Sequence, residues 1–258
     1  MDMQRIFRME YEGEPRYALE QHGAWRLVDG DIFGEQTAGA EVPATGHRLL
    51  PPVSPSKIVC VGLNYRDHAA EQNKPIPPEP LLFIKPSTAV IGPGEPIVLP
   101  QGIGRVDHEA ELGVVIGRRA TRVSERDALA HVLGVTCVND VTARGLQNKG
   151  AGYTRAKGFD TFAPIGPCVV AGLDLASRDG LSVEGRVNGI LRQSSSTREL
   201  IFPIATLISY ISHNMTLLPG DIVSTGTPSG IGPLEPGDVV TVTVGDVCEL
   251  SNPVRNQQ

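Results

Sequence analysis

The sequence has little of what marks an exported, membrane-spanning or nucleic-acid-binding protein. No stretch approaches the roughly 18 consecutive apolar residues that a membrane helix needs. The first residues, MDMQRIFRMEYEG, lack the apolar core of a signal peptide. Aromatic residues make up only 5% of the chain, do not interleave with a lysine and arginine cluster, and accompany a net charge of −6. We therefore expect a cytoplasmic protein with no membrane or nucleic-acid partner.

Cysteine is also scarce, and its spacing does not suggest disulfides or a zinc site. The four cysteines are far apart in the sequence, no two form a Cys-x-x-Cys pair, and each sits in a mostly apolar run. Such cysteines are typical of reduced residues in a hydrophobic core. They are Cys60, Cys137, Cys168 and Cys248.

Glycine and proline are plentiful, with 29 and 21 residues, and they separate short apolar runs. Such punctuation predicts many turns and shaped loops rather than a bundle of long helices. Residues 1–50 contain three short strand-like segments and are expected to form a small β-rich unit. A stretch with four prolines, residues 42–56, leads into the main unit, residues 51–258. Strands and helices mix without a regular βαβ rhythm, so the predicted class is α+β, mainly sheet.

Local patterns define several elements of the main unit. Residues 57–63 read as a buried strand. A short helix through His68 and Glu71 should follow, with Asn64 as its N-cap. Asn188-Gly189 predicts the tip of a β-hairpin, and apolar residues at helical spacing predict a helix after Pro203.

Three carboxylates form the strongest chemical signal. Glu109 and Glu111 are two residues apart at the start of a predicted strand, so both side chains should lie on one face. Asp140 ends the apolar run VLGVTCVND. Burying several negative charges requires compensation, and three oxygen ligands without a nearby cysteine suit Mg²⁺ or Mn²⁺. The alternative is that the glutamates lie on a solvated face and Asp140 caps a helix.

Other polar residues could complete an active site. His68 and Glu71 are three apart and share a helix face, where the carboxylate would orient the imidazole as a base; an exposed pair is the alternative. Arg144 and Gln147 would align with the aspartate on a helix starting at Asp140. Those two residues and a lysine further on, in RAKGFD, could bind an oxyanion or a substrate carboxylate, or could be ordinary surface groups.

Residues 225–232, TGTPSGIG, look like a cradle for an anion built from backbone N–H groups. The loop lacks the lysine and the spacing of a P-loop, so nucleotide binding is poorly supported.

Seven segments together resemble the fumarylacetoacetate hydrolase family, and they occur in family order across most of residues 55–250. They are GLNYRDHAAE, LFIKP with IGPGEPIVLP, DHEAELGVVIG, NDVTARGLQ, KGFDTFAPIGP, the Asn-Gly hairpin, and DIVSTGTPSGIG. The resemblance implies a mixed, rolled β-sheet domain of that family's C-terminal type, usually within a homodimer. It implies that Glu109, Glu111 and Asp140 bind Mg²⁺ or Mn²⁺, and that His68 with Glu71 forms an acid–base pair on a lid helix.

The resemblance also assigns polar groups around the substrate. Lys157, Arg144 and Gln147 match such groups in the family, and Thr227 matches a threonine that contacts substrate. The chain has only some 50 residues before the core, where the long animal members have a large N-terminal domain. It is therefore more similar to the short bacterial and mitochondrial members, and fumarylacetoacetate itself is in doubt as substrate.

The resulting hypothesis is a metal-dependent enzyme that acts on 2-oxo or β-diketo acids through a metal-stabilised enolate. The leading reaction is hydrolysis of a C–C bond in an acylpyruvate-type substrate, with His68 activating water and Lys157 receiving the oxyanion. The alternatives are 2-hydroxyhepta-2,4-diene-1,7-dioate isomerisation and decarboxylation of an oxaloacetate-type diacid, since all three need the same enolate. A metabolite-binding protein without catalysis is a hypothesis of another class.

Overall fold

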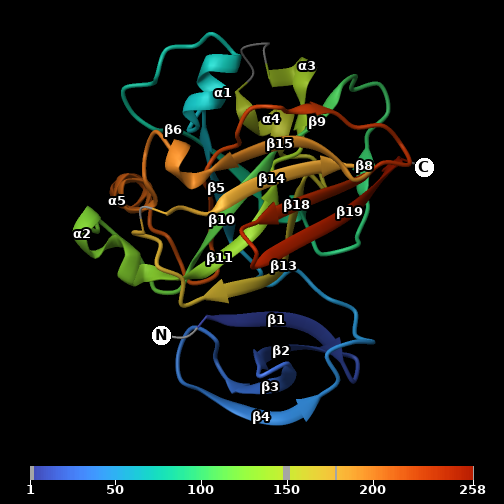
Figure 1. Ribbon diagram of the computed structural model, residues 1–258, viewed down its shortest axis with the longest axis vertical. Helices are drawn as coiled ribbons and strands as arrows, with labels where there is room; N and C mark the ends of the chain where they lie inside the picture. Colours follow the sequence, from blue (N-terminus) through green and yellow to red (C-terminus); the bar gives the residue numbers. More distant parts are fainter. Residues whose placement is uncertain (1–2, 148–151, 178, 258) are drawn as a thin grey trace.

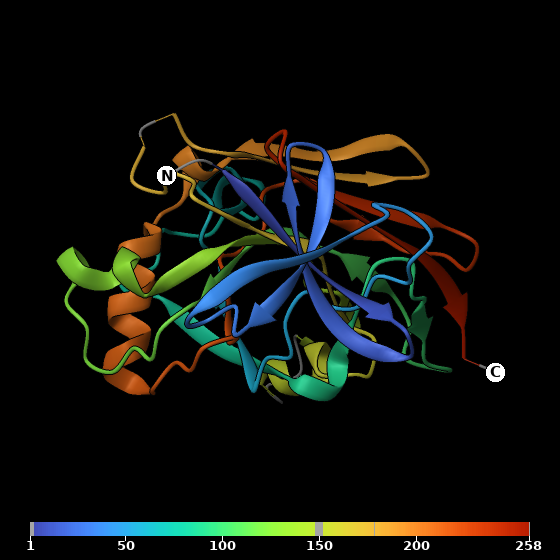
Figure 2. The ribbon, with the colours of Figure 1, turned by 90° about the horizontal axis from the view of Figure 1, so that it is seen from below.

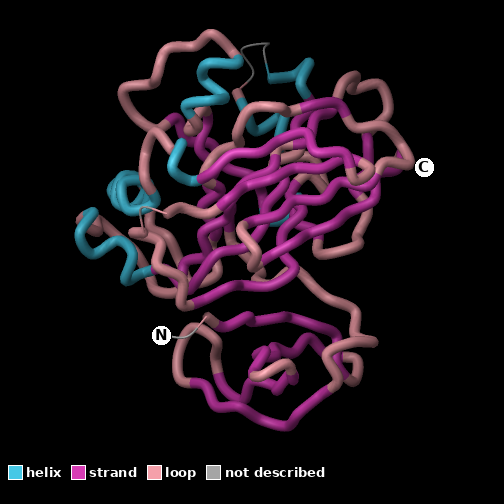
Figure 3. Tube along the Cα trace, viewed as in Figure 1, coloured by secondary structure: helices cyan, strands magenta, loops and turns pink. Residues whose placement is uncertain are grey.

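A computed structural model describes residues 3–147, 152–177 and 179–257. Strands dominate these residues and the helices are few and mostly short, as Figure 3 shows. The predicted α+β class is therefore confirmed. No helix among the described residues is long and apolar enough to cross a membrane.

The largest sheet runs through the whole molecule. Its strands are β1 (Gln4–Tyr11), β2 (Glu14–Gln21), β3 (Ala24–Gly30), β4 (Gln36–Val42), β5 (Lys57–Gly62), β6 (Leu81–Pro86), β7 (Val90–Ile91), β10 (Ala110–Ile116), β11 (Val132–Asn139), β13 (Ala163–Ala171) and β16 (Ile222–Ser224). Their order is β4-β3-β2-β1-β13-β11-β10-β16-β5-β6, with β7 paired to β13. The central strand β10 is buried along its whole length. It is antiparallel to both of its neighbours, β11 and β16.

The N-terminal strands extend this sheet. β1 pairs with β13 in antiparallel register, with Phe7 opposite Cys168. Strands β1 to β4 then curl below the rest of the chain in Figure 1, and Figure 2 shows them from beneath. The division of the chain at residue 50 stays a prediction, because β1 is hydrogen-bonded to a strand of the main unit.

Two smaller sheets complete the strand structure. One has the order β12-β9-β17, and its strands are β12 (Thr142–Ala143), β9 (Val106–His108) and β17 (Gly232–Pro233). The other has the order β15-β14-β18-β19-β8. Its strands are β8 (Ile97–Leu99), β14 (Ser182–Val187), β15 (Ile190–Ser196), β18 (Val239–Val244) and β19 (Cys248–Asn256). Val240, Val242 and Val244 of β18 point into the core, as period-two alternation requires.

The hairpin predicted at Asn188-Gly189 joins β14 to β15. Both turn residues have positive φ, 53° and 77°, which is the conformation of a type I′ turn. Asparagine and glycine tolerate positive φ better than other residues. The Asn-Gly pair therefore predicts the turn because it can adopt the backbone conformation that the turn requires.

The helices lie around the strands. Their bounds are α1 (Arg66–Glu71), α2 (Glu125–Ala128), α3 (Arg144–Gln147), α4 (Tyr153–Lys157) and α5 (Ile204–Asn214), with 3₁₀ turns η1 (Ser87–Ala89), η2 (Leu129–His131) and η3 (Thr197–Glu199). The predicted helix after Pro203 is α5, and it buries Ile204, Leu207, Ile208 and Ile211 on one face. Helices α1, α3 and α4 gather at one end of the molecule in Figure 1, above the site described next.

The cysteine prediction is confirmed. All four cysteines are free and buried. Cys137, Cys168 and Cys248 belong to the same hydrophobic cluster, which packs the large sheet against the hairpin sheet. Cys60 lies in the cluster on the other face.

A candidate metal and acid–base site

Pairing of two central strands brings the three predicted carboxylates together. Ala110 at the start of β10 lies opposite Asn139 at the end of β11. The N–H of Asp140 donates to the carbonyl of Glu109 at 2.9 Å, so these two residues also face each other. Glu111 is two residues further along and therefore shares the face of Glu109. One oxygen from each carboxylate lies within 4.8 Å of the others, and all three residues are buried.

A buried lysine and a partly buried arginine neutralise one side of this cluster. The Nζ of Lys157 donates to Glu109 Oε2 at 2.8 Å and also to Asp140. Arg144 Nη2 donates to Glu109 Oε1 at 2.5 Å. Burial alone would raise the pKa of Glu109, but the lysine and the arginine outweigh it and lower that pKa to about 2. Conversely, burial works against the charged lysine, yet the carboxylates around it raise the pKa of Lys157.

Sequence reasoning missed a second buried lysine. Lys85, at the end of β6, is fully buried, and its Nζ donates to Asp140 Oδ1 at 2.5 Å and to the carbonyl of Val141 at 3.1 Å. A signal was present, since a lysine inside the apolar strand LLFIKP can be buried only beside a negative partner. Asp140 therefore lies between two ammonium groups.

Glu111 lacks such compensation. Its Oε2 accepts hydrogen bonds from Ser224 Oγ at 2.5 Å and from the N–H of Gly226 at 2.9 Å. None of the described cations forms an ion pair with it. Burial and the nearby charge of Asp140 raise the pKa of Glu111 to about 8. A divalent cation would supply the missing positive charge, and three hard carboxylate oxygens fit Mg²⁺ or Mn²⁺.

His68 and Glu71, the predicted acid–base pair, are in contact on α1. His68 Nδ1 lies 2.8 Å from Glu71 Oε2. The other carboxylate oxygen of Glu71 accepts the N–H of Gly230 at 3.0 Å. Only 6% of His68 is exposed, whereas the side chain of Glu71 is 39% exposed. The glutamate therefore orients the ring from the solvent side and leaves the ring edge facing inward.

The predicted cap of this helix is wrong. Tyr65, not Asn64, is the N-cap residue of α1, and it makes no side-chain cap hydrogen bond. Asn64 is fully buried, and its side-chain amide forms hydrogen bonds with two other segments. Its Nδ2 donates to the carbonyl of Thr225 at 2.7 Å, and its Oδ1 accepts the N–H of Phe202 at 2.8 Å. The residue therefore links the start of α1 to the glycine-rich loop.

The helix predicted to start at Asp140 begins later. Thr142 and Ala143 form β12, which pairs with β9, and α3 starts at Arg144. The sheet hydrogen bonds of β12 prevent a helix there. Arg144 nevertheless reaches the site, and its Nη1 donates to Gln147 Oε1 at 2.5 Å. Its Nε donates to the fully buried Asp107 at 2.8 Å.

Backbone N–H groups of the glycine-rich loop donate hydrogen bonds to carboxylates of the same chain. Gly226 donates to Glu111 and Gly230 donates to Glu71, so the loop spans both halves of the site. Thr227 donates its hydroxyl to the carbonyl of Ala110 at 2.9 Å and accepts Gln193 Nε2 at 2.8 Å. Thr227 is therefore fixed in place rather than free to rotate.

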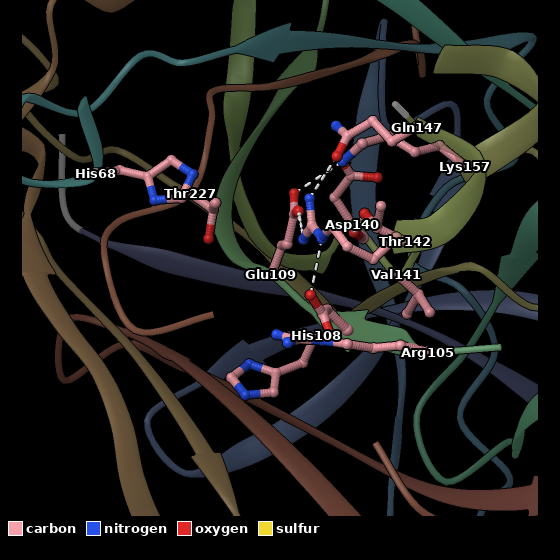
Figure 4. Close-up of polar contacts among 12 residues, drawn as sticks. His68, Arg105, His108, Glu109, Asp140, Val141, Thr142, Gln147, Lys157 and Thr227 are labelled. Carbon is pink, nitrogen blue, oxygen red and sulfur yellow. Dashed lines mark hydrogen bonds and ion pairs between the residues drawn. The ribbon is translucent and has the colours of Figure 1, made fainter. Parts of the chain in front are cut away.

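Many of these groups line one small pocket with a volume of about 60 Å³. Figure 4 shows His68 and Thr227 on one side of Glu109, and Asp140, Gln147 and Lys157 on the other. All nine predicted site residues except Glu71 line the pocket, which also includes Gln72, Lys74, Phe83 and Tyr153. Glu71 acts from behind the His68 ring.

Comparisons with known proteins agree with this architecture. The family model described as fumarylacetoacetate (FAA) hydrolase C-terminal matches residues 57–255. A second model, described as Rv2993c-like, N-terminal, matches residues 4–52. The mitochondrial oxaloacetate tautomerase of Xenopus laevis is 42% identical over 282 residues, which cover 96% of this chain and 88% of the relative.

Solved structures are similar over nearly the whole chain. The 2-hydroxyhepta-2,4-diene-1,7-dioate isomerase of Mycobacterium marinum has a TM-score of 0.90 and 38% identity, covering 98% of this chain and 99% of that one. Fumarylacetoacetate hydrolase of Exiguobacterium antarcticum has a TM-score of 0.86 and 33% identity, with coverage of 98% and 100%. The chain belongs to the fumarylacetoacetate hydrolase family, as its motifs predicted.

Proposed function

We propose that the protein is a divalent-metal-dependent enzyme that moves a proton at the carbon beside the 2-oxo group of a small 2-oxo acid. Keto–enol tautomerisation and double-bond isomerisation belong to this class. One observation carries the proposal: an oriented imidazole and a cluster of three buried carboxylates line the same small pocket. The imidazole supplies a base, and the carboxylates supply a site for a cation.

Glu109, Glu111 and Asp140 would hold the cation. When bound, Mg²⁺ or Mn²⁺ supplies Lewis-acid stabilisation for the enolate of a 2-oxo acid. The chain's own groups then orient the substrate and move the proton. His68, held by Glu71, takes the proton from the carbon next to the 2-oxo group and returns it to the product.

Cations and amides next to the cluster would bind the acid. Arg144 and Gln147 lie at the pocket wall and are hydrogen-bonded to each other, so they present donors in a fixed arrangement. A fixed arginine suits a substrate carboxylate. Thr227 and Lys157 line the pocket as well, and the buried ammonium provides positive potential where charge develops.

The names of the relatives support proton transfer, because a tautomerase and an isomerase are among them. Hydrolysis of a C–C bond in an acylpyruvate is the second candidate. The His68–Glu71 pair favours it, since a carboxylate-oriented imidazole can also deprotonate water. Decarboxylation of a 2-oxo diacid would use the same enolate without water.

A substrate panel tests the proposal. Purified protein is stripped with EDTA, reloaded with Mg²⁺ or Mn²⁺, and given oxaloacetate, 2-hydroxyhepta-2,4-diene-1,7-dioate and an acylpyruvate. We expect metal-dependent loss of the enol signal without mass change. Release of pyruvate with a new carboxylic acid would indicate hydrolysis instead, and release of CO₂ would indicate decarboxylation. No turnover with either metal would favour a metabolite-binding role and contradict the proposal.

We further propose a cytoplasmic homodimer. The hairpin sheet exposes large apolar side chains, with Ile190 57%, Leu191 45% and Val239 42% exposed. Such a patch suits association with a second copy. Light scattering of the wild type should give twice the chain mass, and Leu191→Lys should shift it towards the monomer.

A further inference from the structure

The lid contains a third polar group that the family pattern did not point to. Gln72 directly follows α1 and is its C-cap residue. Its side-chain Nε2 lies 2.7 Å from His68 Nε2, and its backbone N–H donates to the carbonyl of His68 at 3.1 Å. Gln72 also lines the pocket. It therefore contacts the ring nitrogen that faces the site.

The protonation of the ring follows from its two partners. An ionised carboxylate can only accept a hydrogen bond, so Nδ1 carries the proton that is shared with Glu71. In a neutral ring, Nε2 then has the lone pair and accepts a hydrogen bond from the Gln72 amide. Glu71 thus orients the His68 ring, and the Gln72 amide occupies the hydrogen-bonding position at Nε2.

We propose that Gln72 is a residue that determines the reaction, because its amide occupies the position in which a nucleophilic water would bind to His68. This inference rests on the proposed function. In hydrolysis, a water held by Nε2 loses its proton to His68 and its oxygen attacks the distal carbonyl. The C3–C4 bond breaks, its electron pair stays on C3, and C3 takes up the proton. That water must be hydrogen-bonded to Nε2 throughout.

Proton transfer does not need this water. The C3–H proton passes to Nε2, the electron pair forms the enolate, and the protonated Nε2 then gives that proton to the enolate oxygen. A substrate anchored by its acid group can displace one amide hydrogen bond, because the net contribution of a single hydrogen bond is small. A lone water has no such anchor and competes with an amide tethered beside the ring.

Two variants separate the hydrogen bond from the space that Gln72 fills. Gln72→Ala removes the amide and leaves room for water at Nε2. Gln72→Leu removes the donor but fills the position with an apolar group. Gln36→Ala, an exposed glutamine in β4, is the control. Each protein, loaded with Mn²⁺, is given an acylpyruvate in H₂¹⁸O, and tautomerisation and cleavage are measured in one reaction by NMR and mass spectrometry.

In Gln72→Ala we expect the ratio of cleavage to tautomerisation to rise by about tenfold, the equivalent of one hydrogen bond. The released acid should contain ¹⁸O. Gln72→Leu and Gln36→Ala should keep the low ratio of the wild type. Gln72→Asn, whose amide is one methylene too short to reach Nε2, should give an intermediate increase, and it provides a second readout if the alanine variant folds poorly.

Several outcomes would overturn the inference. These are an unchanged ratio in Gln72→Ala, including an equal loss of both reactions, an equal rise in Gln72→Leu, or a wild type that already cleaves as fast as it tautomerises. A wild type that turns over none of the 2-oxo acids would refute the proposed function itself. The two failures are therefore distinguishable.

Discussion

The two walls of the pocket are built in different ways. The carboxylate wall lies at the start of β10 and the end of β11, in the middle of the large sheet, and all three carboxylates are buried. The lid wall stands on α1, a helix of six residues without a side-chain cap, and its Glu71 is exposed. Buried charge thus lies at the ends of central strands, and the proposed acid–base group lies on a short helix held by a few hydrogen bonds.

We expect the two walls to have different roles, with the carboxylate wall binding metal and the lid wall moving the proton. Burying several carboxylates is costly, so their cations must be positioned by the fold before any ligand binds. The lid wall carries no such cost, because its carboxylate, Glu71, is partly exposed and accepts the N–H of Gly230. Substitutions in the two walls should therefore differ in kind, with metal binding and stability affected in one and catalysis alone in the other.

Asp140→Ala should have the largest combined effect, because it changes metal binding, activity and the buried charge balance together. It removes a metal ligand and leaves Lys85 and Lys157 facing each other without their shared carboxylate. Loss of Lewis-acid stabilisation worth several kcal/mol lowers kcat by on the order of 10³-fold. Steady-state kinetics with saturating Mn²⁺ measures this loss. Asp246→Ala, in an exposed turn, should retain wild-type activity, and an Asp140→Ala protein with normal kcat would refute the site.

His68→Ala tests the lid wall alone. Removal of a general base lowers kcat by about 10²–10⁴-fold. Stabilisation by Mn²⁺ in a thermal unfolding assay should be unchanged, because no metal ligand is touched. His213→Ala, an exposed histidine on α5, is the matched control. If the His68 variant lost its response to Mn²⁺, the two walls would not be separable.

Lys85→Met tests how far Lys85 compensates the negative charge of Asp140. Removal of one partner from a buried ion pair costs about 3–5 kcal/mol, so the free energy of unfolding should fall by this amount. Urea denaturation without metal gives the value. Lys74→Met, at an exposed position near the lid, should change stability by less than about 0.5 kcal/mol. A Lys85 variant as stable as the wild type would show that Lys157 alone compensates Asp140.

Asn64→Ala should have the smallest effect on the molecule as a whole. It removes the buried amide that links the lid to residues 202 and 225, at a cost of about 1–3 kcal/mol. Amide hydrogen exchange should speed up in α1 and the glycine-rich loop, and remain unchanged in β10 and β11. Uniformly faster exchange would mean that the lid and the sheet are one cooperative unit.

Sequence patterns were most informative where the local backbone alone determines the structure. The Asn188-Gly189 turn, the α5 face and the shared face of Glu109 and Glu111 all follow from backbone periodicity or φ preference. The family motifs then brought distant segments to one site. Patterns failed where tertiary contacts decided the outcome. Asn64 serves two loops rather than its helix.

The buried partners were the hardest to foresee. Lys85 lies 55 residues from Asp140 in the sequence, and only the pairing of the sheet brings them together. Gln72 looks like any polar residue at the end of an exposed helix, and its contact with His68 depends on the rotamer. Such pairings follow from the fold and not from spacing.

The central claim is that three carboxylates of this chain hold one divalent cation beside a histidine base. Calorimetric titration of the EDTA-stripped protein with Mn²⁺ tests it directly, using wild type, His68→Ala and Glu111→Gln. The last variant keeps the shape of the side chain and can still accept the hydrogen bonds of Ser224 and Gly226, but it loses the charge. We predict one site per chain in the wild type and in His68→Ala, and none in Glu111→Gln. Wild-type Mn²⁺ binding by Glu111→Gln would contradict the account.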